Sequence, residues 1–166
     1  SHLINTVGFI PNGNRTYYLG RSQPPFFALM VNLLAEIKGP EILLQYRHQL
    51  EKEYAFWTAG ENQLGQNGAH RRVVAMGDGY ILNRYWDDNP APRPEAYVED
   101  LHIASESGRD PESVYRHIRA AAESGWDFSS RWFDDQENMA TIQTTDYVPV
   151  DLNCLLYYLE KTLMNI

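Results

Sequence analysis

Apolar side chains recur along this chain at steps of three and four residues, the spacing of one face of a helix. Between residues 41 and 60 this stripe consists of Leu43, Tyr46, Leu50, Tyr54 and Trp57. Near the end of the chain it consists of Leu152, Leu155, Leu159 and Leu163. With the flanking Pro, Gly and Asp residues, the pattern predicts helices over residues 25–38, 40–60, 94–106, 110–124 and 151–166, with a short helical stretch around residues 3–7.

Proline, glycine and aspartate mark the ends of these helices. The dipeptide Gly39-Pro40 is the whole link between the first two long helices, which predicts an antiparallel helical hairpin. Asp110 directly precedes a proline, the pattern of an N-cap followed by the first helical residue. Gly125 can adopt the left-handed conformation that ends a helix, and Asp151 is expected to cap the last helix.

Long connections rich in Gly, Pro and aromatic residues separate the helices. Residues 8–24 are predicted to form a loop, residues 61–70 a polar loop, and residues 72–86 a small β-hairpin around a Gly-Asp-Gly turn. Long loops are uncommon in compact domains unless they are functional. The predicted fold class is therefore mainly α, either a helical toroid with its chemistry on loops at one rim or a plainer four-helix bundle. The bundle does not explain why three of the four tryptophans lie in loops.

Composition narrows the classes of partner. The 166 residues carry a formal net charge of -8, which repels a phosphate backbone, so no nucleic-acid partner is expected. The apolar runs are too short to span a bilayer, so no membrane partner is expected. Cys154 is the only cysteine, which leaves no intrachain disulfide, and the five histidines do not cluster, so no metal site is expected. The aromatic content of 13% suits sugar stacking or an aromatic core.

Asp127 is the most unusual candidate residue, because it stands among aromatic residues just after a predicted helix end, in "SGWDFSSRW". Partial burial among Trp126, Phe128 and Trp132 would raise the pKa of this carboxyl. A protonated acid is what a glycosidase uses to protonate its leaving group. The alternative is a structural ion pair with Arg131, and spacing alone favours it.

Three loop arginines, Arg21, Arg84 and Arg93, stand beside proline or aromatic residues. A planar guanidinium suits vicinal hydroxyls and fixed carboxylates, so together the three indicate a rigid polar pocket. Surface salt bridges explain them equally well, with Asp87, Asp88, Glu95 and Glu99 as the available partners. Asn12 and Asn14 in "PNGN" are candidate hydrogen-bonding ligands, but taken alone the pattern favours a turn.

Four blocks of the sequence together resemble the trehalases of glycoside hydrolase family 37, in the family's order. They are "GFIPNGNRTYYLGRSQPPFFALMV", "LNRYWDD" followed by "PRPE", "SGWDFSSRWF" and "TTDYVPVDLN". The resemblance implies an (α/α)6 toroid, or barrel, that hydrolyses the α,α-1,1 bond of trehalose to two glucoses with inversion and without a cofactor. Asp127 matches the general acid. The positions that match substrate contacts are Asn12, Arg21, Ser22, Gln23, Arg93, Pro94, Glu95 and Gly125.

Two further blocks of the family are missing from this sequence. One holds the glutamate that activates water, in a motif close to Gln-Trp-Asp-x-Pro-Asn, and the other is an arginine block, Pro-Gly-Gly-Arg-Phe. We therefore expect residues 1–166 to be a single internal segment of a larger (α/α)6 catalytic domain, with no domain boundary inside it and with the remaining helices supplied by flanking chain. Trehalose is the expected small-molecule partner. Alone, the chain is expected to be inactive or nearly so, because inversion needs two carboxylates.

Two other functions stay open at this point. One is a related (α/α)-barrel glycosidase for another disaccharide, which pocket shape would distinguish and sequence spacing does not. A sugar-binding or regulatory module would keep the pocket without the catalytic base. The residues do not decide between the periplasm and the cytoplasm of a bacterium, and they do not fix the oligomeric state.

Overall fold

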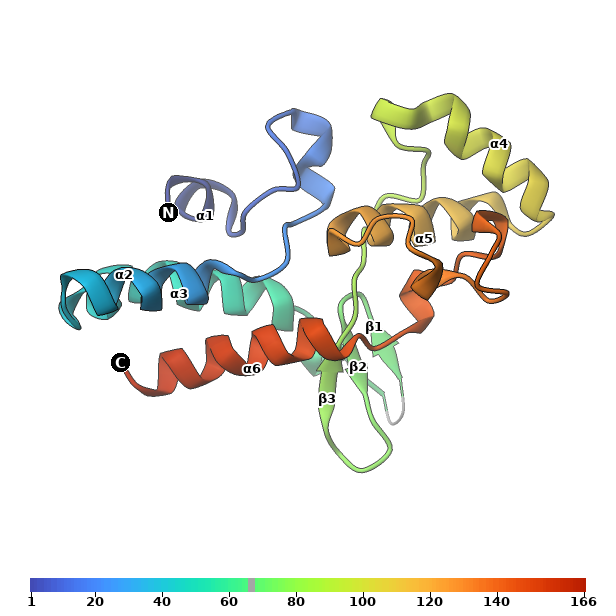
Figure 1. The fold of residues 1–166 in the computed structure, drawn as a ribbon. Helices are drawn as coiled ribbons and strands as arrows, with labels where there is room; N and C mark the ends of the chain where they lie inside the picture. The colour runs from blue at the N-terminus through green and yellow to red at the C-terminus, as the bar shows by residue number, and fades with distance from the viewer. Residues whose placement is uncertain (66–67) are drawn as a thin grey trace. The chain divides into compact units, whose positions relative to one another are not determined.

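The computed structural model describes residues 1–65 and 68–166, which fold into two compact units (Figure 1). Unit 1 comprises Ser1–Ile10, Gln23–Asn83 and Pro149–Ile166, and unit 2 comprises Pro11–Ser22 and Arg84–Val148. Both units are assembled from segments that are far apart in the sequence. The local helices predicted above are therefore held together by long-range contacts.

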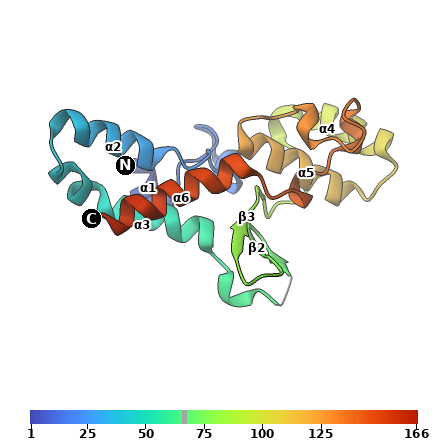
Figure 2. The same ribbon diagram turned by 60° about the horizontal axis from the view of Figure 1, so that its bottom comes forward.

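Unit 1 is built on three helices that pack against one another: α2 (Phe27–Lys38), α3 (Glu41–Thr58) and α6 (Val150–Met164). The first two form the predicted antiparallel hairpin, and α6 runs alongside it in both views (Figure 1, Figure 2). The short α1 (His2–Val7) packs on α3. Among the side chains buried in this core are Ile4, Leu50, Trp57, Leu152 and Leu159.

A small antiparallel sheet completes unit 1. Its strands are β1 (Ala69–His70), β2 (Val73–Ala75) and β3 (Ile81–Asn83), in the order β1-β2-β3. The Asn83 N–H donates to Asn153 Oδ1 at 2.8 Å, and Asn153 Nδ2 donates to the Asn83 carbonyl at 2.9 Å, which joins the sheet to α6. The hairpin β2–β3 is the predicted one. The pattern does not predict β1, which falls in the expected polar loop 61–70, and residues 66–67 of that loop lie outside the described residues.

Two predicted details of the last helix are wrong. It begins at Val150 with Pro149 at its N-cap, so Asp151 lies in the first turn instead of capping the helix. Its buried face consists of Leu152, Leu156, Leu159 and Thr162. Leu155 is half-buried, because two adjacent leucines both fit the helical period and the sequence alone does not choose between them.

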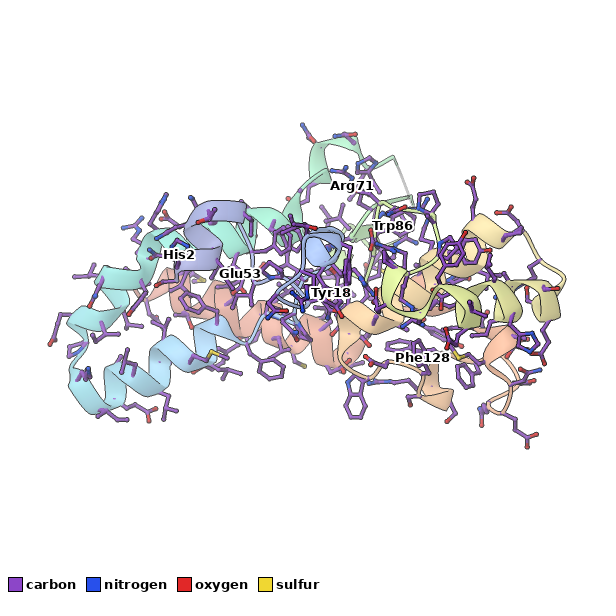
Figure 3. The ribbon with its side chains drawn as sticks, turned by 90° about the horizontal axis from the view of Figure 1, so that it is seen from above. His2, Tyr18, Glu53, Arg71, Trp86 and Phe128 are labelled. Atoms are coloured by element: carbon purple, nitrogen blue, oxygen red, sulfur yellow. The ribbon has the colours of Figure 1, made fainter. Side chains whose placement is uncertain are left out.

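The buried face of α3 includes a carboxyl group that its apolar stripe does not contain. Glu53 is 2% exposed, and its Oε2 has no hydrogen-bond partner (Figure 3). Burial disfavours the charged carboxylate and raises the pKa of Glu53 to about 8. Glu53 is therefore mostly protonated in the folded chain at neutral pH.

This proton makes stability depend on pH. Between its ordinary pKa of 4.5 and about 8, the folded chain keeps the Glu53 proton and the unfolded chain releases it, so rising pH favours unfolding. Glu53→Gln cannot ionise. We expect it to raise the free energy of unfolding by about 1–3 kcal/mol at about pH 9, with a much smaller gain at about pH 4. Urea unfolding at both pH values measures this, and Glu36→Gln, at an exposed position, is the control. Equal gains at the two pH values would contradict the prediction.

Unit 2 is organised around α5 (Pro111–Ser124), which is buried along most of its length. α4 (Tyr97–Ser107) packs beside it. Short 3-10 turns complete the unit, at Thr16–Gly20, Pro94–Ala96, Ser130–Trp132, Met139–Thr141 and Thr144–Asp146. The predicted caps of α5 are confirmed, because Asp110 Oδ2 accepts from the Ser113 N–H at 3.0 Å and Gly125 has a φ of 72°. The buried residues of α5 include His117, Arg119 and Glu123, so charged and polar groups lie inside this unit.

Candidate functional site

The nine candidate residues are Asp127 and the eight positions that match substrate contacts in the resemblance. Eight of the nine lie in unit 2. The exception is Gln23, which belongs to unit 1, where its N–H donates to the Ile10 carbonyl at 2.7 Å. The other eight come from three segments of unit 2: the loop before residue 23, the loop between β3 and α4, and the turn that follows α5. These segments meet at the last turn of α5.

Hydrogen bonds fix both loops to that helical turn. Glu123 is fully buried, and its Oε1 accepts from the N–H and the hydroxyl of Ser22 at 2.9 and 3.0 Å. Its Oε2 accepts from the Trp86 N–H at 2.9 Å. Asn12 Nδ2 donates to the Ala122 carbonyl at 3.0 Å. The candidates Asn12 and Ser22 are thus brought together on one turn, although Ser22 and Glu123 are 101 positions apart.

Arg21 is fully buried and lies at the centre of a network of opposite charges. Its Nη2 donates to Glu95 Oε1 at 2.7 Å, and its Nε lies 3.7 Å from Asp87 Oδ2. Arg119 of α5 donates from Nε to the same Asp87 oxygen at 2.7 Å. Gly20 makes room for this carboxylate, since a Cβ there would lie 2.7 Å from Asp87 Oδ1. Burial works against the Glu95 carboxylate, but the hydrogen bond and charge of Arg21 outweigh it and hold the pKa of Glu95 below its usual value.

A second buried pair fixes Arg93. Its Nη2 donates to Asp100 Oδ1 at 2.6 Å, and its Nε and backbone N–H donate to Oδ2 at 3.0 and 2.8 Å. One buried carboxylate of α4 therefore holds both the guanidinium and the backbone. The 3-10 turn that begins at Pro94 follows directly and carries Glu95.

The three loop arginines also stack on aromatic rings, and the rings concerned are labelled in Figure 3. The distances from Cζ to ring centroid are 5.3 Å for Arg21 over Tyr18, 4.7 Å for Arg93 over Phe128 and 4.5 Å for Arg84 over Trp86. Such contacts stabilise by about 0.5–2 kcal/mol and restrict the orientation of a guanidinium. The salt bridges considered above are confirmed for Arg21 in their partners, Asp87 and Glu95, but the Arg21 side chain is buried and not on the surface. For Arg93 they are wrong, because Arg93 is buried and pairs with Asp100.

Asp127 lies in a sharp turn directly after α5. Gly125 has a φ of 72° and Asp127 a φ of 26°, so both residues have left-handed backbone. This conformation costs a non-glycine residue about 1–3 kcal/mol, although aspartate tolerates it better than most. Strained residues of this kind cluster at functional sites. The neighbouring ring of Phe128 stacks on Arg93, so the turn and the arginine lie together.

The expected burial of Asp127 among aromatic rings is wrong. Asp127 is exposed, Trp126 and Phe128 are 54% and 37% exposed, and the buried ring of this segment is Trp132. The residue that contacts two tryptophans is Arg131, whose Cζ lies 4.7 Å from the Trp126 centroid and 4.9 Å from the Trp132 centroid. In a left-handed turn, neighbours in the sequence point in different directions. The aromatic residues flanking Asp127 therefore do not enclose its carboxylate.

Unit 2 also has a polar hollow of about 410 Å³, lined in part by Arg84, Trp86, Arg116 and His117. Both guanidiniums lie 4.5 Å from the Trp86 centroid. Burial lowers the pKa of His117 to about 4, so this imidazole is neutral at pH 7 even though it lies 4.0 Å from Asp146. Arg84 is thus a pocket residue as its neighbours suggest, but its pocket contains none of the nine candidates.

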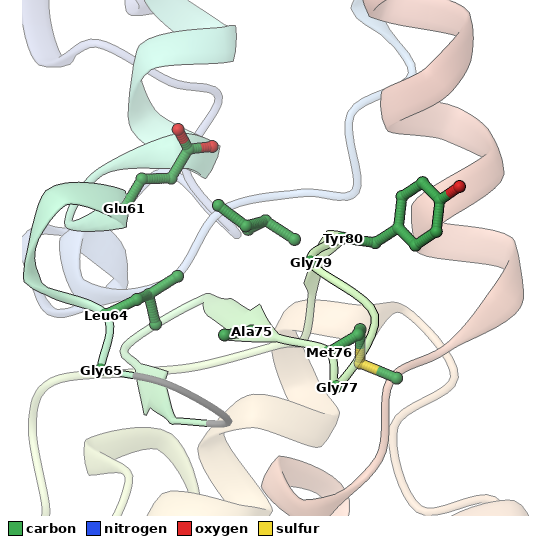
Figure 4. Close-up of a pocket in the computed structure, with 9 residues that line it drawn as sticks. Glu61, Leu64, Gly65, Ala75, Met76, Gly77, Gly79 and Tyr80 are labelled. Carbon is green, nitrogen blue, oxygen red and sulfur yellow. The ribbon is translucent and has the colours of Figure 1, made fainter.

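A hollow of about 320 Å³ in unit 1 lies between the β2–β3 hairpin and the segment that follows α3 (Figure 4). It is lined in part by Glu61, Leu64, Met76 and Tyr80. None of the candidate residues lines it, and Glu61 is its single titratable carboxyl.

Within residues 1–65 and 68–166, no three His, Cys, Asp or Glu side chains are grouped so that they could hold a metal ion. None of the helices that the structure describes has the length and hydropathy needed to cross a membrane.

Four buried charged residues of the cluster are not singled out by the sequence as parts of a site: Asp87, Asp100, Arg119 and Glu123. One signal points to two of them. Arg119 and Glu123 are four positions apart, on one face of a helix whose other residues in this stretch are mostly small and apolar. Charges on such a face need buried partners.

Comparison with known proteins gives a consistent result. The family model described as Trehalase matches residues 1–166. The chain is 57% identical over 161 residues to the proteins named periplasmic trehalase of Salmonella newport and Salmonella choleraesuis, and 56% identical to the putative periplasmic trehalase of Salmonella typhi. Each match covers 96% of this chain and 28% of the relative. The chain therefore spans less than a third of the length of the curated relatives that it matches.

Proposed function

The chain belongs to the trehalase family, and on this basis we propose that it supplies part of the catalytic domain of an enzyme that hydrolyses α,α-trehalose to two glucose molecules. The observation that carries the proposal is the convergence at the end of α5. Ser22 is fixed there, with the Arg21–Glu95 pair next to it, beside the turn that carries Asp127. Hydrolysis of a disaccharide needs such a set: hydroxyl-binding groups held rigidly next to a carboxylic acid.

In this proposal Asp127 is the general acid. Its carboxyl gives a proton to the bridging oxygen of trehalose as the bond between that oxygen and C1 breaks, and the first glucose leaves. A carboxylate from outside these 166 residues takes a proton from water. The water oxygen forms the new bond to C1 on the opposite face, so the configuration inverts and the protons balance. The proposed reaction uses no cofactor.

The ion-paired groups around Arg21 and Arg93 are proposed to bind the sugar hydroxyls. Arg21 is fully buried and donates to Glu95 Oε1 at 2.7 Å, so its part in this proposal is to hold the Glu95 carboxylate in place for the sugar. Glu95 is kept ionised and can accept from hydroxyls. Because these groups are fixed before the substrate arrives, they need little reorganisation. The further contacts in this proposal are Asn12, Ser22, Gln23, Arg93, Pro94 and Gly125.

We also propose that both units are parts of one (α/α)6 domain, which chain outside these residues completes. The exposed apolar side chains of α2, which include Met30, Leu33 and Ile37, support this. Contiguous apolar surface of this kind marks a face that another part of a protein covers.

The test is a trehalase assembled from the Salmonella newport relative, in which this chain replaces the matching 161 residues. We expect this assembled trehalase to release glucose from trehalose at a rate within about tenfold of the parent, because the proposed acid and sugar contacts are all supplied by this chain. The isolated chain should release none above background. A folded assembled trehalase that leaves trehalose intact, or that prefers another disaccharide such as sucrose or maltose, would overturn the proposal. Glucose release by the isolated chain at the parent's rate would contradict the expectation that the catalytic base lies outside these 166 residues.

A further inference from the structure

We propose that Glu123 is a positioning residue, whose buried carboxylate holds the two loops that carry Arg21 and Asp87 against the end of α5. In this way it sets where the sugar-binding groups lie relative to Asp127. The inference rests on the proposed function for its catalytic consequence, but its structural core stands on hydrogen bonds within unit 2.

Both oxygens of Glu123 are used by donors from other segments. Oε1 accepts two hydrogen bonds from Ser22, one from the N–H at 2.9 Å and one from the hydroxyl at 3.0 Å. Oε2 accepts from the Trp86 N–H at 2.9 Å. The residue is fully buried, so water does not compete for these donors. Hydrogen bonds from N–H groups to an ionised acceptor are about twice as strong as those to a neutral one.

The two backbone groups that Glu123 holds are next to the central pair of the charge network. Ser22 follows Arg21 in the chain, and Trp86 precedes Asp87. The side chains of Arg21 and Asp87 in turn approach to 3.7 Å. Two contacts therefore connect the same two loops. Glu123 binds their backbone N–H groups, and the ion pair joins their side chains.

The same carboxylate is close to the proposed acid along the chain. Glu123 lies two residues before Gly125, where α5 ends, and four before Asp127. Ala122, on the same turn, accepts from Asn12 Nδ2. Any shift of Glu123 against Ser22 would thus change the spacing between the sugar-binding loop and the acid.

An amide cannot replace this carboxylate, because the Ser22 N–H, the Ser22 hydroxyl and the Trp86 N–H all donate to it. In Glu123→Gln, either Oε1 or Oε2 becomes an NH₂ group that faces an N–H. At least one buried donor then loses its acceptor. The substitution keeps the size and shape of the side chain, so it changes the hydrogen bonding and charge of this group without leaving a cavity.

The first measurement is kinetic, in the assembled trehalase. We expect Glu123→Gln to lower kcat/KM for trehalose by about 10²-fold, mainly through a higher KM, since small displacements of positioning groups cost this much. α-Glucosyl fluoride, whose leaving group needs no proton, should show a similar loss, because both substrates use the same sugar site. Glu112→Gln, an exposed Glu on the same helix, should stay within about twofold of the unsubstituted enzyme.

The second measurement is amide hydrogen exchange in the same protein. Glu123→Gln should speed exchange of the Ser22 and Trp86 N–H groups by about tenfold or more, and Glu112→Gln should not. Unchanged exchange at both amides would overturn the proposal whether or not the protein hydrolyses trehalose. Unchanged KM and kcat in an active assembled trehalase would overturn the positioning role alone. In a third outcome, the assembled trehalase folds but is inactive, with faster amide exchange in Glu123→Gln. That result would support the role of Glu123 in holding the two loops and would overturn the proposed function.

Discussion

Asp127→Asn in the assembled trehalase is expected to lower kcat for trehalose by about 10²–10⁴-fold, because an amide has no proton to give to the bridging oxygen. Asparagine is the informative substitution at this position. The backbone φ of Asp127 is 26°, and asparagine, like aspartate, tolerates the left-handed region, so the turn after α5 should keep its shape. Alanine would mix loss of the acid with backbone strain. Initial rates of glucose release measure the effect.

A substrate with a better leaving group separates the acid from the rest of the site. α-Glucosyl fluoride leaves without protonation, so Asp127→Asn should lose far less activity on it than on trehalose. Asp78→Asn makes the same chemical change in an exposed turn of unit 1 and should leave both rates unchanged within about twofold. Equal losses on the two substrates would show that Asp127 acts on structure or sugar binding. A trehalose rate close to that of the unsubstituted enzyme would exclude Asp127 as the acid.

The limits of α5 could be predicted from the sequence because the signals that set them are local. Asp110 caps α5 three residues from its partner Ser113, and Gly125 ends the helix by its own backbone conformation. The α2–α3 hairpin follows in the same way from a two-residue link. Strand β1 could not be predicted, because two residues are too few to show an alternating pattern.

The surroundings of the candidate site could not be predicted, because its partners are distant in the sequence. Residue types and the family resemblance select Arg21 and Glu95, but nothing local says that they pair across 74 positions. Asp127 illustrates the opposite error. Its sequence neighbours are aromatic, yet its turn leaves it exposed and places Arg131 against the tryptophans. In a strand or helix, the regular backbone lets the sequence neighbours of a residue predict what surrounds its side chain. In a turn that reverses the backbone, they do not.

Buried charge in unit 2 leads to the largest stability effect that we expect. Asp87 is fully buried, accepts from Arg119 Nε at 2.7 Å and lies 3.7 Å from Arg21 Nε. Its other oxygen, Oδ1, accepts from the Asn89 N–H at 2.9 Å. Asp87→Ala removes the carboxylate and leaves two buried guanidiniums facing each other without it. Breaking one side of a buried pair costs about 3–5 kcal/mol, and we expect a loss of this size in the free energy of unfolding, measured by urea titration with tryptophan fluorescence.

A matched control separates the effect of burial on the free energy of unfolding from the effect of the ion-pair contact itself. Arg47 and Glu51 also meet through an Nε–O contact of 2.7 Å, but their side chains are 56% and 47% exposed. Glu51→Ala should therefore cost less than about 1 kcal/mol, although the contact that it breaks has the same length. If Asp87→Ala cost no more than Glu51→Ala, the buried charges of unit 2 would be solvated in solution and the network would not be a rigid part of the site. A large difference would mean that the charges which orient Arg21 also hold unit 2 together, so that variants of the site must be checked for folding before their kinetics are compared.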